Sequence, residues 1–553
     1  MFTKAGKRHL AITTAILATA VGCASAVQAE ASPKHTASAV QAEASPKHTA
    51  SAVQAEASPK HTASALVRTD NGPVRGTTTG TVRTFQGIPY AAPPTKGLRW
   101  KAPQPAKPWS APLDTRKPRS ACPQPSDQPI AIPDNNEDCL YLNVTTPAGT
   151  AKGLPVIVWI HGGSFVYGDG AGYRAERLAV RGGAVVVTIN YRLGVFGLLA
   201  HPDLDAPANL GLQDQQAALR WVRRNAPAFG GDAGNVTVMG QSAGGYSVCA
   251  HMAAPGSAGL FDKAIVQSAG CVGSPDSTHT LKQARTAGIA MAKAAGCPDG
   301  KTADRCLRGK STAEVLAASE AGHEGYRLTV DGKVLPRSPA NAFAGGTFNK
   351  VPVLYGSTHD EEAGRIGGME MATGKALTAD DYVTQVTGAF GENAGAVLAE
   401  YPLNAYGSPS EALTAVMTDA NWSTPIFTTQ RTLARHVPVY AYDLTEATSP
   451  YFKGIPRPSF PLGTGHMIDL AYLFDNALFE PLTTPQARLA NAMIDYWSRF
   501  ARAGDPSHSG SPTWERFTAD KPYTQALSAG RNGIGRTDFA ADHHYTFWNS
   551  LGR

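Results

Sequence analysis

The sequence predicts an α/β fold with a large, doubly wound, mostly parallel sheet flanked by helices. Short apolar runs recur along the chain, and each is uniform enough to be buried on both faces, which is typical of parallel strands. Stretches with helical spacing of apolar residues separate these runs. The expected strands are residues 156–160 (VIVWI), 184–190 (AVVVTIN), 236–239 (VTVM), 264–268 (AIVQS), 351–355 (VPVLY) and 438–444 (PVYAYDL).

Helices are expected at residues 212–224 and 280–295, where apolar residues return with helical spacing. A length of 553 residues would suggest three or four domains at roughly 150 residues each. However, no linker-like stretch interrupts residues 66–553, so we expect one large domain there.

The composition excludes several classes of protein. Hydrophobic residues make up 42% of the chain and charged residues 17%, which argues against a disordered or coiled-coil protein. The formal net charge is +6, and half of it comes from the first 65 residues. Because the remainder is nearly neutral and has no basic cluster, we expect no nucleic-acid partner.

Residues 1–29 have the pattern of a secretory signal peptide. Lys4, Lys7 and Arg8 precede an apolar run at residues 10–21 that is too short to span a bilayer, and small residues then offer a cleavage site. No stop-transfer stretch follows, so we expect secretion and no membrane span. A lipid anchor at Cys23 is an alternative, because the residues before it weakly resemble a lipoprotein cleavage box.

Residues 30–65 are predicted to form a repetitive, disordered tether. The unit ASAVQAEASPKHT occurs three times between residues 24 and 62 and contains no large apolar residue that could build a core. The repeated His35, His48 and His61 could bind a metal, but they lack a folded scaffold. We therefore interpret the segment as a solvated linker ahead of a folded domain at residues 66–553.

The cysteines of that domain fit an oxidising compartment, since six remain when Cys23 is set aside. One pair brackets a Pro-rich loop and another a short polar loop, so each is placed to close its loop. The last two are expected within a helix and beyond the next strand, where free thiols and a bridge both remain possible. Cys122 and Cys139 bracket the Pro-rich loop, and Cys297 and Cys306 bracket the polar loop. The last two cysteines are Cys249 and Cys271.

The predicted nucleophile is Ser242, in the motif Gly240-Gln241-Ser242-Ala243-Gly244. The motif directly follows an expected strand and precedes an Ala-rich stretch. A strand-to-helix turn that exposes a serine strains its backbone, and the flanking glycines leave room for the crossing chains. An ordinary glycine turn is the alternative, and the strand–turn–helix context favours the nucleophile.

A second motif, His161-Gly162-Gly163-Ser164-Phe165, follows the expected strand at residues 156–160. A serine that attacks a carbonyl creates an oxyanion, which needs fixed N–H donors. We expect these donors to be the backbone N–H groups of Gly163, Ser164 and Ala243, with Gly162 shaping the turn. The alternative is a glycine-rich strand exit without a catalytic role.

With these motifs, the chain resembles the type B carboxylesterase family, which includes cholinesterases and bacterial para-nitrobenzyl esterases. The resemblance extends from about residue 66 to the end of the chain and implies an α/β-hydrolase fold. It also implies a Ser-Glu-His triad in that chain order. The further matching segments are residues 85–91 (FQGIPYA), 137–143 (EDCLYLN), 190–194 (NYRLG), 209–221, 229–232 (FGGD) and 547–549 (FWN).

The resemblance assigns the catalytic acid to Glu361, five residues after Gly356, with the neighbouring Asp360 as the alternative. It assigns the catalytic base to His466, which precedes an acidic residue by three places and a Phe by eight. Two positions depart from the family pattern, because Glu362 and Met467 stand where relatives commonly have Gly.

Supporting residues are also implied by the resemblance. Ser268 is expected near the acid and base, although a plain serine at a strand end is an equal alternative. The family's structural contacts imply the ion pairs Arg99–Glu137 and Arg192–Asp214 and the disulfides Cys122–Cys139 and Cys297–Cys306.

The resulting hypothesis is a secreted, monomeric serine carboxylesterase that hydrolyses small-molecule esters through an acyl-enzyme on Ser242, without metal or cofactor. Cholinesterases carry a cation-binding Trp in the first disulfide loop, whereas residues 123–138 contain no aromatic residue, so a choline ester is not the expected substrate. The alternatives are a lipase or sterol esterase of the same family and a non-catalytic adhesion relative.

Overall fold

The computed structural model describes residues 62–125, 132, 134–204, 206–274, 277–297, 300, 302–320 and 325–552. The predicted signal peptide and the predicted tether up to residue 61 lie outside the described residues. The first strand, β1 (Thr62–Arg68), begins earlier than residue 66, the expected start of the domain. Its antiparallel pairing with β2 (Pro73–Thr79) starts at Thr62 and Thr79, so the end of the repeat belongs to the sheet.

A 13-stranded sheet forms the centre of the molecule, in the order β1-β2-β3-β5-β7-β6-β8-β9-β12-β13-β14-β15, with β4 beside β2. The seven strands from β7 to β14 in this order run parallel, and antiparallel strands flank them. The remaining strands are β3 (Val82–Pro89), β4 (Leu113–Asp114), β5 (Tyr141–Pro147), β6 (Leu154–Ile160), β7 (Val185–Ile189), β8 (Gly231–Gln241), β9 (Lys263–Gln267), β12 (Val353–Thr358), β13 (Val439–Leu444), β14 (Thr524–Leu527), β15 (Ile534–Thr537) and the separate pair β10 (His279–Thr280) and β11 (Thr329–Val330).

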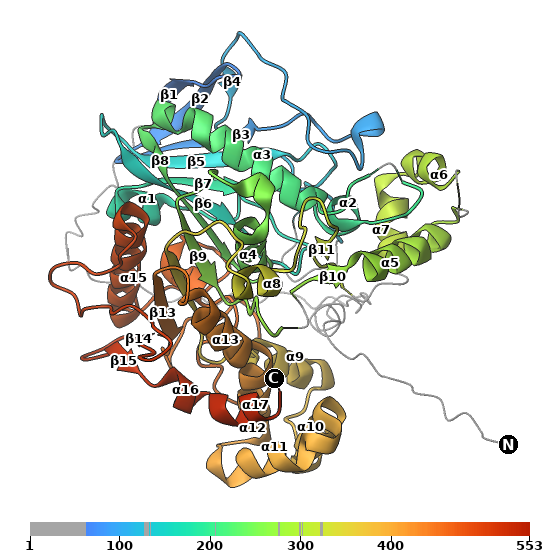
Figure 1. The fold of residues 1–553 in the computed structure, drawn as a ribbon. Helices are drawn as coiled ribbons and strands as arrows, with labels where there is room; N and C mark the ends of the chain where they lie inside the picture. The colour runs from blue at the N-terminus through green and yellow to red at the C-terminus, as the bar shows by residue number, and fades with distance from the viewer. Residues whose placement is uncertain are drawn as a thin grey trace, which may run out of the picture.

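Helices connect the strands and cover the sheet (Figure 1). They are α1 (Glu176–Gly182), α2 (Gly194–Leu198), α3 (Leu210–Asn225), α4 (Ala243–Ala253), α5 (Leu281–Ala294), α6 (Ala303–Gly309), α7 (Thr312–Glu320), α8 (Pro339–Ala344), α9 (Ala363–Thr373), α10 (Ala379–Phe390), α11 (Ala394–Glu400), α12 (Pro409–Thr418), α13 (Thr424–Leu433), α14 (Asp469–Leu473), α15 (Thr484–Ala503), α16 (Phe539–Asp542) and α17 (Tyr545–Ser550). Within the part of the chain that the structure describes, none of these helices is long and apolar enough to cross a membrane.

The predicted parallel strands and both predicted helices are confirmed, and they differ from the structure mainly at their ends. Strand β12 continues past the apolar run through Gly356, Ser357 and Thr358, because these residues pair with β13. The antiparallel strands β1, β2, β3 and β5 were not predicted, and neither was the short strand β4, which pairs with β2 in parallel. In β5, side chains alternate between buried and half-buried positions, so this strand has no continuous apolar run.

Side chains of the central strands point alternately to two cores, one on each face of the sheet. Val156, Val158 and Ile160 of β6 pack in one core, which includes residues of α3 and α4. Ile157 and Trp159 pack in the other core, which includes Trp497 of α15. The sheet is therefore buried on both faces, as expected for a doubly wound fold.

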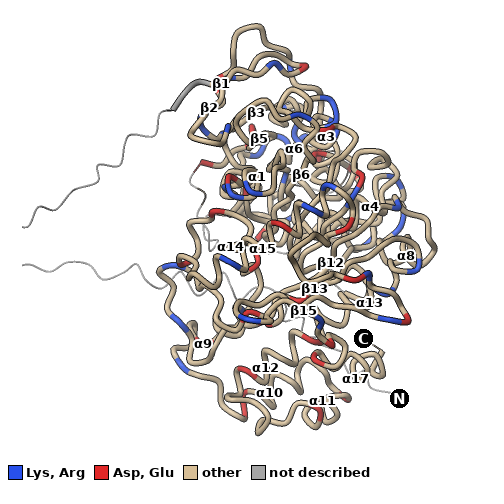
Figure 2. The backbone as a smooth tube through the Cα atoms, turned by 90° about the vertical axis from the view of Figure 1, so that its left-hand side faces the viewer, with Lys and Arg blue, Asp and Glu red and all other residues tan. Residues whose placement is uncertain are grey.

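A helical lobe lies below the sheet in Figure 1, formed by α9 to α12 together with α17 near the carboxyl terminus. It has a core of its own, in which Tyr382, Leu413 and Trp548 are buried. Lys, Arg, Asp and Glu residues are interspersed along the described chain in Figure 2, in keeping with the small net charge.

Three disulfides are formed. Cys122–Cys139 and Cys297–Cys306 close the two expected loops. Cys249 and Cys271, which the sequence left undecided between free thiols and a bridge, form the third disulfide, with 6.4 Å between their Cα atoms. This pairing follows from the packing of α4 on β9, which brings the helix beside the segment that follows the strand.

We expect the Cys249→Ala, Cys271→Ala double variant to lose about 3 kcal/mol of unfolding free energy, because the bridge restrains 22 residues of the unfolded chain. Urea denaturation of the wild type and of the variant, each under oxidising and under non-oxidising conditions, measures the difference in unfolding free energy. The matched control is the Cys297→Ala, Cys306→Ala variant, whose shorter loop predicts a smaller loss of about 2.5 kcal/mol. A Cys249/Cys271 variant as stable as wild type would contradict the expectation.

Candidate active site

Ser242 lies at the sharp turn between β8 and α4. Its backbone has φ 56° and ψ −124°, a strained conformation for a residue with a side chain. The turn is fixed from both sides, because Ser242 N donates to Gln267 O of β9 at 2.9 Å and Tyr246 N donates to Ser242 O at 2.9 Å. The serine is thus held at the carboxyl edge of the parallel strands.

Two glycines make this turn sterically possible. A Cβ atom on Gly244 would lie inside van der Waals contact with the carbonyl of Ile160 at the end of β6, and a Cβ on Gly240 would collide with the carbonyl of Gly244. The start of α4 therefore packs directly on the backbone of β6, which only glycine at these positions allows.

The glycine loop after β6 lies beside the serine, because β6 and β8 are neighbouring parallel strands. A Cβ atom on Gly162 would lie 3.0 Å from the Cβ of Ser242. Gly163, Ser164 and Phe165 have positive φ angles of 104°, 52° and 62° in succession. Three consecutive residues in this region turn the backbone sharply out of the strand direction.

The backbone N–H groups of Gly163, Ser164 and Ala243 donate no hydrogen bond to any described residue. The loop is fixed next to the sharp turn at Ser242, which we call the elbow. The three N–H groups are therefore available to an acceptor from outside the protein. Oxygen atoms that gain negative charge are held by such unpaired, preoriented donors.

His161, which precedes these glycines, is buried and has a structural role. Its Nδ1 lies 2.8 Å from Gly162 O, and its ring stacks on Tyr191 with centroids 4.5 Å apart. Burial lowers the pKa of His161 to about 4, more than its hydrogen bond to the Gly162 carbonyl raises it. The imidazole is therefore neutral at physiological pH and fixes the start of the loop.

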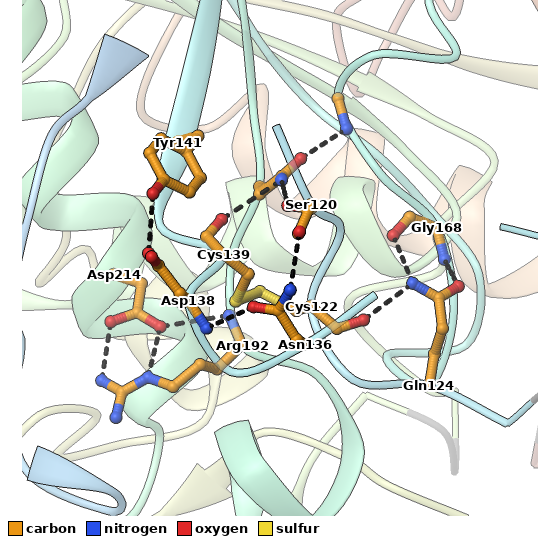
Figure 3. Close-up of a disulfide and its surroundings, with 12 residues drawn as sticks. Ser120, Cys122, Gln124, Asn136, Asp138, Cys139, Tyr141, Gly168, Arg192 and Asp214 are labelled. Carbon is orange, nitrogen blue, oxygen red and sulfur yellow. Dashed lines mark hydrogen bonds and ion pairs between the residues drawn. A yellow bond between two sulfur atoms is a disulfide. The ribbon is translucent and has the colours of Figure 1, made fainter. Parts of the chain in front are cut away.

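The first disulfide loop supports the same region, as Figure 3 shows. Gln124 donates to Cys122 O at 2.9 Å and accepts from Gly168 N at 3.0 Å, which ties the loop to the chain after the glycine motif. The two expected ion pairs are also formed, Arg192–Asp214 at 2.7 Å and fully buried, and Arg99–Glu137 with two hydrogen bonds.

Glu361 and His466 are joined by hydrogen bonds of both side chain and backbone. Glu361 Oε2 is hydrogen-bonded to His466 Nδ1, and His466 N donates to Glu361 O at 3.2 Å. The carboxylate is fully buried and its Oε1 accepts from Thr358 N at 3.1 Å. Asp360, the alternative acid, accepts instead from Thr464 N at 2.9 Å, so the structure places Glu361 against the imidazole.

The charge around His466 favours its protonated form. Burial alone would lower the pKa of His466, but the charge of Glu361 and its hydrogen bond outweigh burial, and Asp469 and Glu362 add to the effect. Asp469, at the start of α14, is itself buried, and burial together with the charge of Glu361 raises its pKa to about 7. The sequence pattern included Asp469 but did not mark it as a site residue.

Ser242 and His466 make no hydrogen bond to each other among the described residues. His466 Nε2 lies 3.2 Å from Nε2 of Gln241, the residue before the serine. The ring of Trp422 lies against the imidazole with centroids 4.6 Å apart. Neither contact could be predicted from the sequence, because neither residue belongs to a spacing pattern that includes the histidine.

Among the described residues, Ser268 makes no side-chain hydrogen bond to Glu361 or His466. Its backbone N donates to Gly356 O at 2.8 Å, but its buried Oγ has no partner among the described residues. The link from β9 to the acid and base runs instead through the preceding residue, since Gln267 Nε2 donates to the Asp469 carboxylate.

The two departures from the family pattern have different structural outcomes. Glu362 adopts φ −86° and ψ −3°, a helical conformation that residues other than glycine also adopt without strain. Its side chain accepts a hydrogen bond from Trp422 Nε1 at 2.7 Å. The turn after Glu361 therefore does not require glycine. Met467, in contrast, has φ 76°, which favours glycine and leaves this chain with a strained residue beside His466.

The sheet order, the nucleophile-elbow turn and the acid–histidine pair together define an α/β-hydrolase. A model of the carboxylesterase family matches residues 63–548. Similar proteins include the para-nitrobenzyl esterase of Bacillus subtilis, 35% identical over 84% of this chain and 95% of its own, and the acylcarnitine hydrolase of Mus musculus, 34% identical over 84% and 89%. The cocaine esterase of Oryctolagus cuniculus is 34% identical over 83% and 91%. The chain belongs to the carboxylesterase family.

We expect Glu361→Gln to lower the pKa of His466, because it removes the negative charge that stabilises the imidazolium. NMR titration of histidine-labelled protein measures the change. Glu362→Gln is the matched control, since Glu362 acts on the same imidazole more weakly, and it should lower the pKa less. An unchanged or raised pKa in Glu361→Gln would refute this electrostatic coupling.

Proposed function

We propose that this carboxylic ester hydrolase is a secreted serine carboxylesterase that works through an acyl-enzyme on Ser242, with Glu361 and His466 completing the triad. The observation that carries the proposal is the hydrogen bond between Glu361 and His466 beside the elbow of Ser242. The elbow strain, the neighbouring glycine loop and the unpaired N–H groups support it.

In the first step, His466 takes the proton of Ser242 as its hydroxyl oxygen attacks the ester carbonyl. The imidazole must be neutral to accept that proton, so the raised pKa of His466 places the rise in activity at higher pH than an ordinary histidine would. Glu361 then stabilises the imidazolium through Nδ1. This coupling holds the ring in the tautomer that leaves Nε2 free to act as base.

In the described conformation, Gln241 Nε2 lies 3.2 Å from His466 Nε2. The Gln241 amide must therefore move away from this nitrogen before Ser242 can donate its proton to it. The donors for the oxyanion are the N–H groups of Gly163, Ser164 and Ala243, with Gly162 shaping the loop. Once the tetrahedral intermediate collapses, the imidazolium protonates the leaving alcohol. Water then attacks the acyl-enzyme by the reverse sequence.

Export of the chain is supported by two features. The amino-terminal residues 1–29 follow the signal-peptide pattern. All six cysteines of the domain are paired in disulfides, which persist in oxidising compartments.

We expect Ser242→Ala to reduce kcat for p-nitrophenyl esters by about 10⁵–10⁶-fold, because the nucleophile is removed. Steady-state kinetics over a series of acyl chain lengths measures this and also addresses substrate class. Ser277→Ala, a half-buried serine outside the site, is the control and should match wild type. Equal rates for wild type and Ser242→Ala would overturn the mechanism, and rates that rise steeply with acyl length at an interface would favour the lipase alternative.

We expect acetylcholine and a neutral ester of the same shape to be hydrolysed with kcat/KM values within about tenfold of each other. A quaternary ammonium gains roughly 0.5–2 kcal/mol from an aromatic face, and residues 123–138 supply none. Competition between the two esters in one assay gives the ratio directly. A preference for acetylcholine well above tenfold would show that another part of the chain binds the cation.

A further inference from the structure

A second cluster of histidine and carboxylate side chains lies outside the proposed triad. His359 follows β12, Asp443 belongs to β13, and His543 follows α16 near the carboxyl terminus. One ligand-type atom from each of the three side chains lies within 4.8 Å of the others. The first two are 84 residues apart in sequence, which is why no spacing pattern in the sequence indicated them.

Two of the separations between these atoms are close to those expected around a shared ion. His359 Nδ1 lies 2.8 Å from Asp443 Oδ2, and His543 Nε2 lies 3.6 Å from the same oxygen. Ligand atoms about 2.0 Å from a tetrahedral zinc ion are about 3.3 Å apart, between these two values. A distance of 3.6 Å is too long for a hydrogen bond, so the histidine and the carboxylate face each other without one.

Two buried atoms in the cluster have no hydrogen-bond partner among the described residues. They are His543 Nε2 and Asp443 Oδ1. Their side chains are 3% and 0% exposed, so water does not compensate them in the way it would at the surface. These two atoms, one on a buried imidazole and one on a buried carboxylate, are of the kind that binds a cation.

The other nitrogen of His543 is held as in known metal-binding histidines. Nδ1 lies 2.6 Å from Asp419 Oδ1, in the π-helical turn Asp419–Ser423. Tyr401 OH donates to the second oxygen of Asp419 at 2.7 Å, and Trp548 Nε1 donates to Tyr401 OH at 2.6 Å. A carboxylate on Nδ1 fixes the tautomer that leaves Nε2 as an acceptor, which is the usual outer contact of a ligating histidine.

The charge of the cluster also calls for a cation. Asp443 and Asp419 are both buried, and in the described part of the chain their ion-pair partners are histidines alone, without Lys or Arg. A cation bound between Asp443 and His543 would compensate this buried negative charge.

We propose that His359, Asp443 and His543 bind a divalent transition-metal ion of the zinc type. Two imidazoles and one carboxylate suit zinc, whereas magnesium and calcium prefer oxygen ligands alone. His359 is 35% exposed, which gives the ion a path from solvent. The bound ion would tie the ends of β12 and β13, next to the Glu361 turn, to the carboxyl-terminal segment.

The test is zinc titration of the full chain after dialysis against a chelator, by calorimetry at a pH above neutral, with Co²⁺ absorption as a second readout of low-coordinate geometry. We expect one zinc ion per chain at this site, and His359→Ala to bind it at least 100-fold more weakly. Magnesium should not compete. Because His359 is partly exposed, its replacement should fold, and circular dichroism checks this.

Three further variants distinguish this site from other zinc binding. His544→Ala, next to His543 and equally exposed as His359 but paired with Glu400, is the matched control and should keep the ion. Replacing His35, His48 and His61 together should also leave it in place. Asp419→Asn should weaken binding 10–100-fold, through the orientation of His543.

Absence of zinc binding in wild type would overturn the proposal, as would equal affinity in wild type and His359→Ala. Loss of the ion in the variant lacking the tether histidines would place the metal there instead. Ser242→Ala should bind zinc like wild type, so failure of the proposed catalytic mechanism and failure of this site are separate outcomes.

Discussion

The close approach of α4 to β6 is the constraint on which the site depends. Gly244 touches the carbonyl of Ile160 and Gly240 touches the first turn of α4, so β8 can end in a turn that holds Ser242 at positive φ. The same contact sets the glycine loop beside the serine, because that loop begins where β6 ends. Any side chain at either glycine would separate the helix from the strand, and this would move the proposed nucleophile away from the proposed N–H donors.

The proposed acid and base approach Ser242 from the strands on the other side of β8. Glu361 follows β12 and His466 follows β13, and these strands are neighbours in the same parallel order. Their loops are joined through backbone as well as side-chain hydrogen bonds, so the imidazole has little freedom to turn. Asp469 and Gln267 extend the polar contacts to β9, the strand that also holds the elbow through Gln267 O. A continuous set of buried hydrogen bonds thus connects the three proposed triad segments.

The carboxyl-terminal segment links the helical lobe to the sheet through buried side chains. His543 and Trp548 are buried between the helical lobe and the end of β13, where they contact Asp419, Tyr401 and Asp443. Two buried carboxylates at such a junction are costly unless positive charge compensates them. In the proposed site the bound ion supplies that charge, and it couples the lobe to the strand ends that carry the proposed acid and base.

Local patterns in the sequence were sufficient for the central strands, the elbow at Ser242 and the glycine loop, because each depends on residues close together in the chain. Resemblance to a family added Glu361 and His466, whose surroundings have their own short signatures. The bridge Cys249–Cys271, the contact of Gln241 with His466 and the cluster around Asp443 could not be predicted in this way. Each joins segments that are distant in the chain, and such contacts exist only once the sheet order has brought the strand ends together.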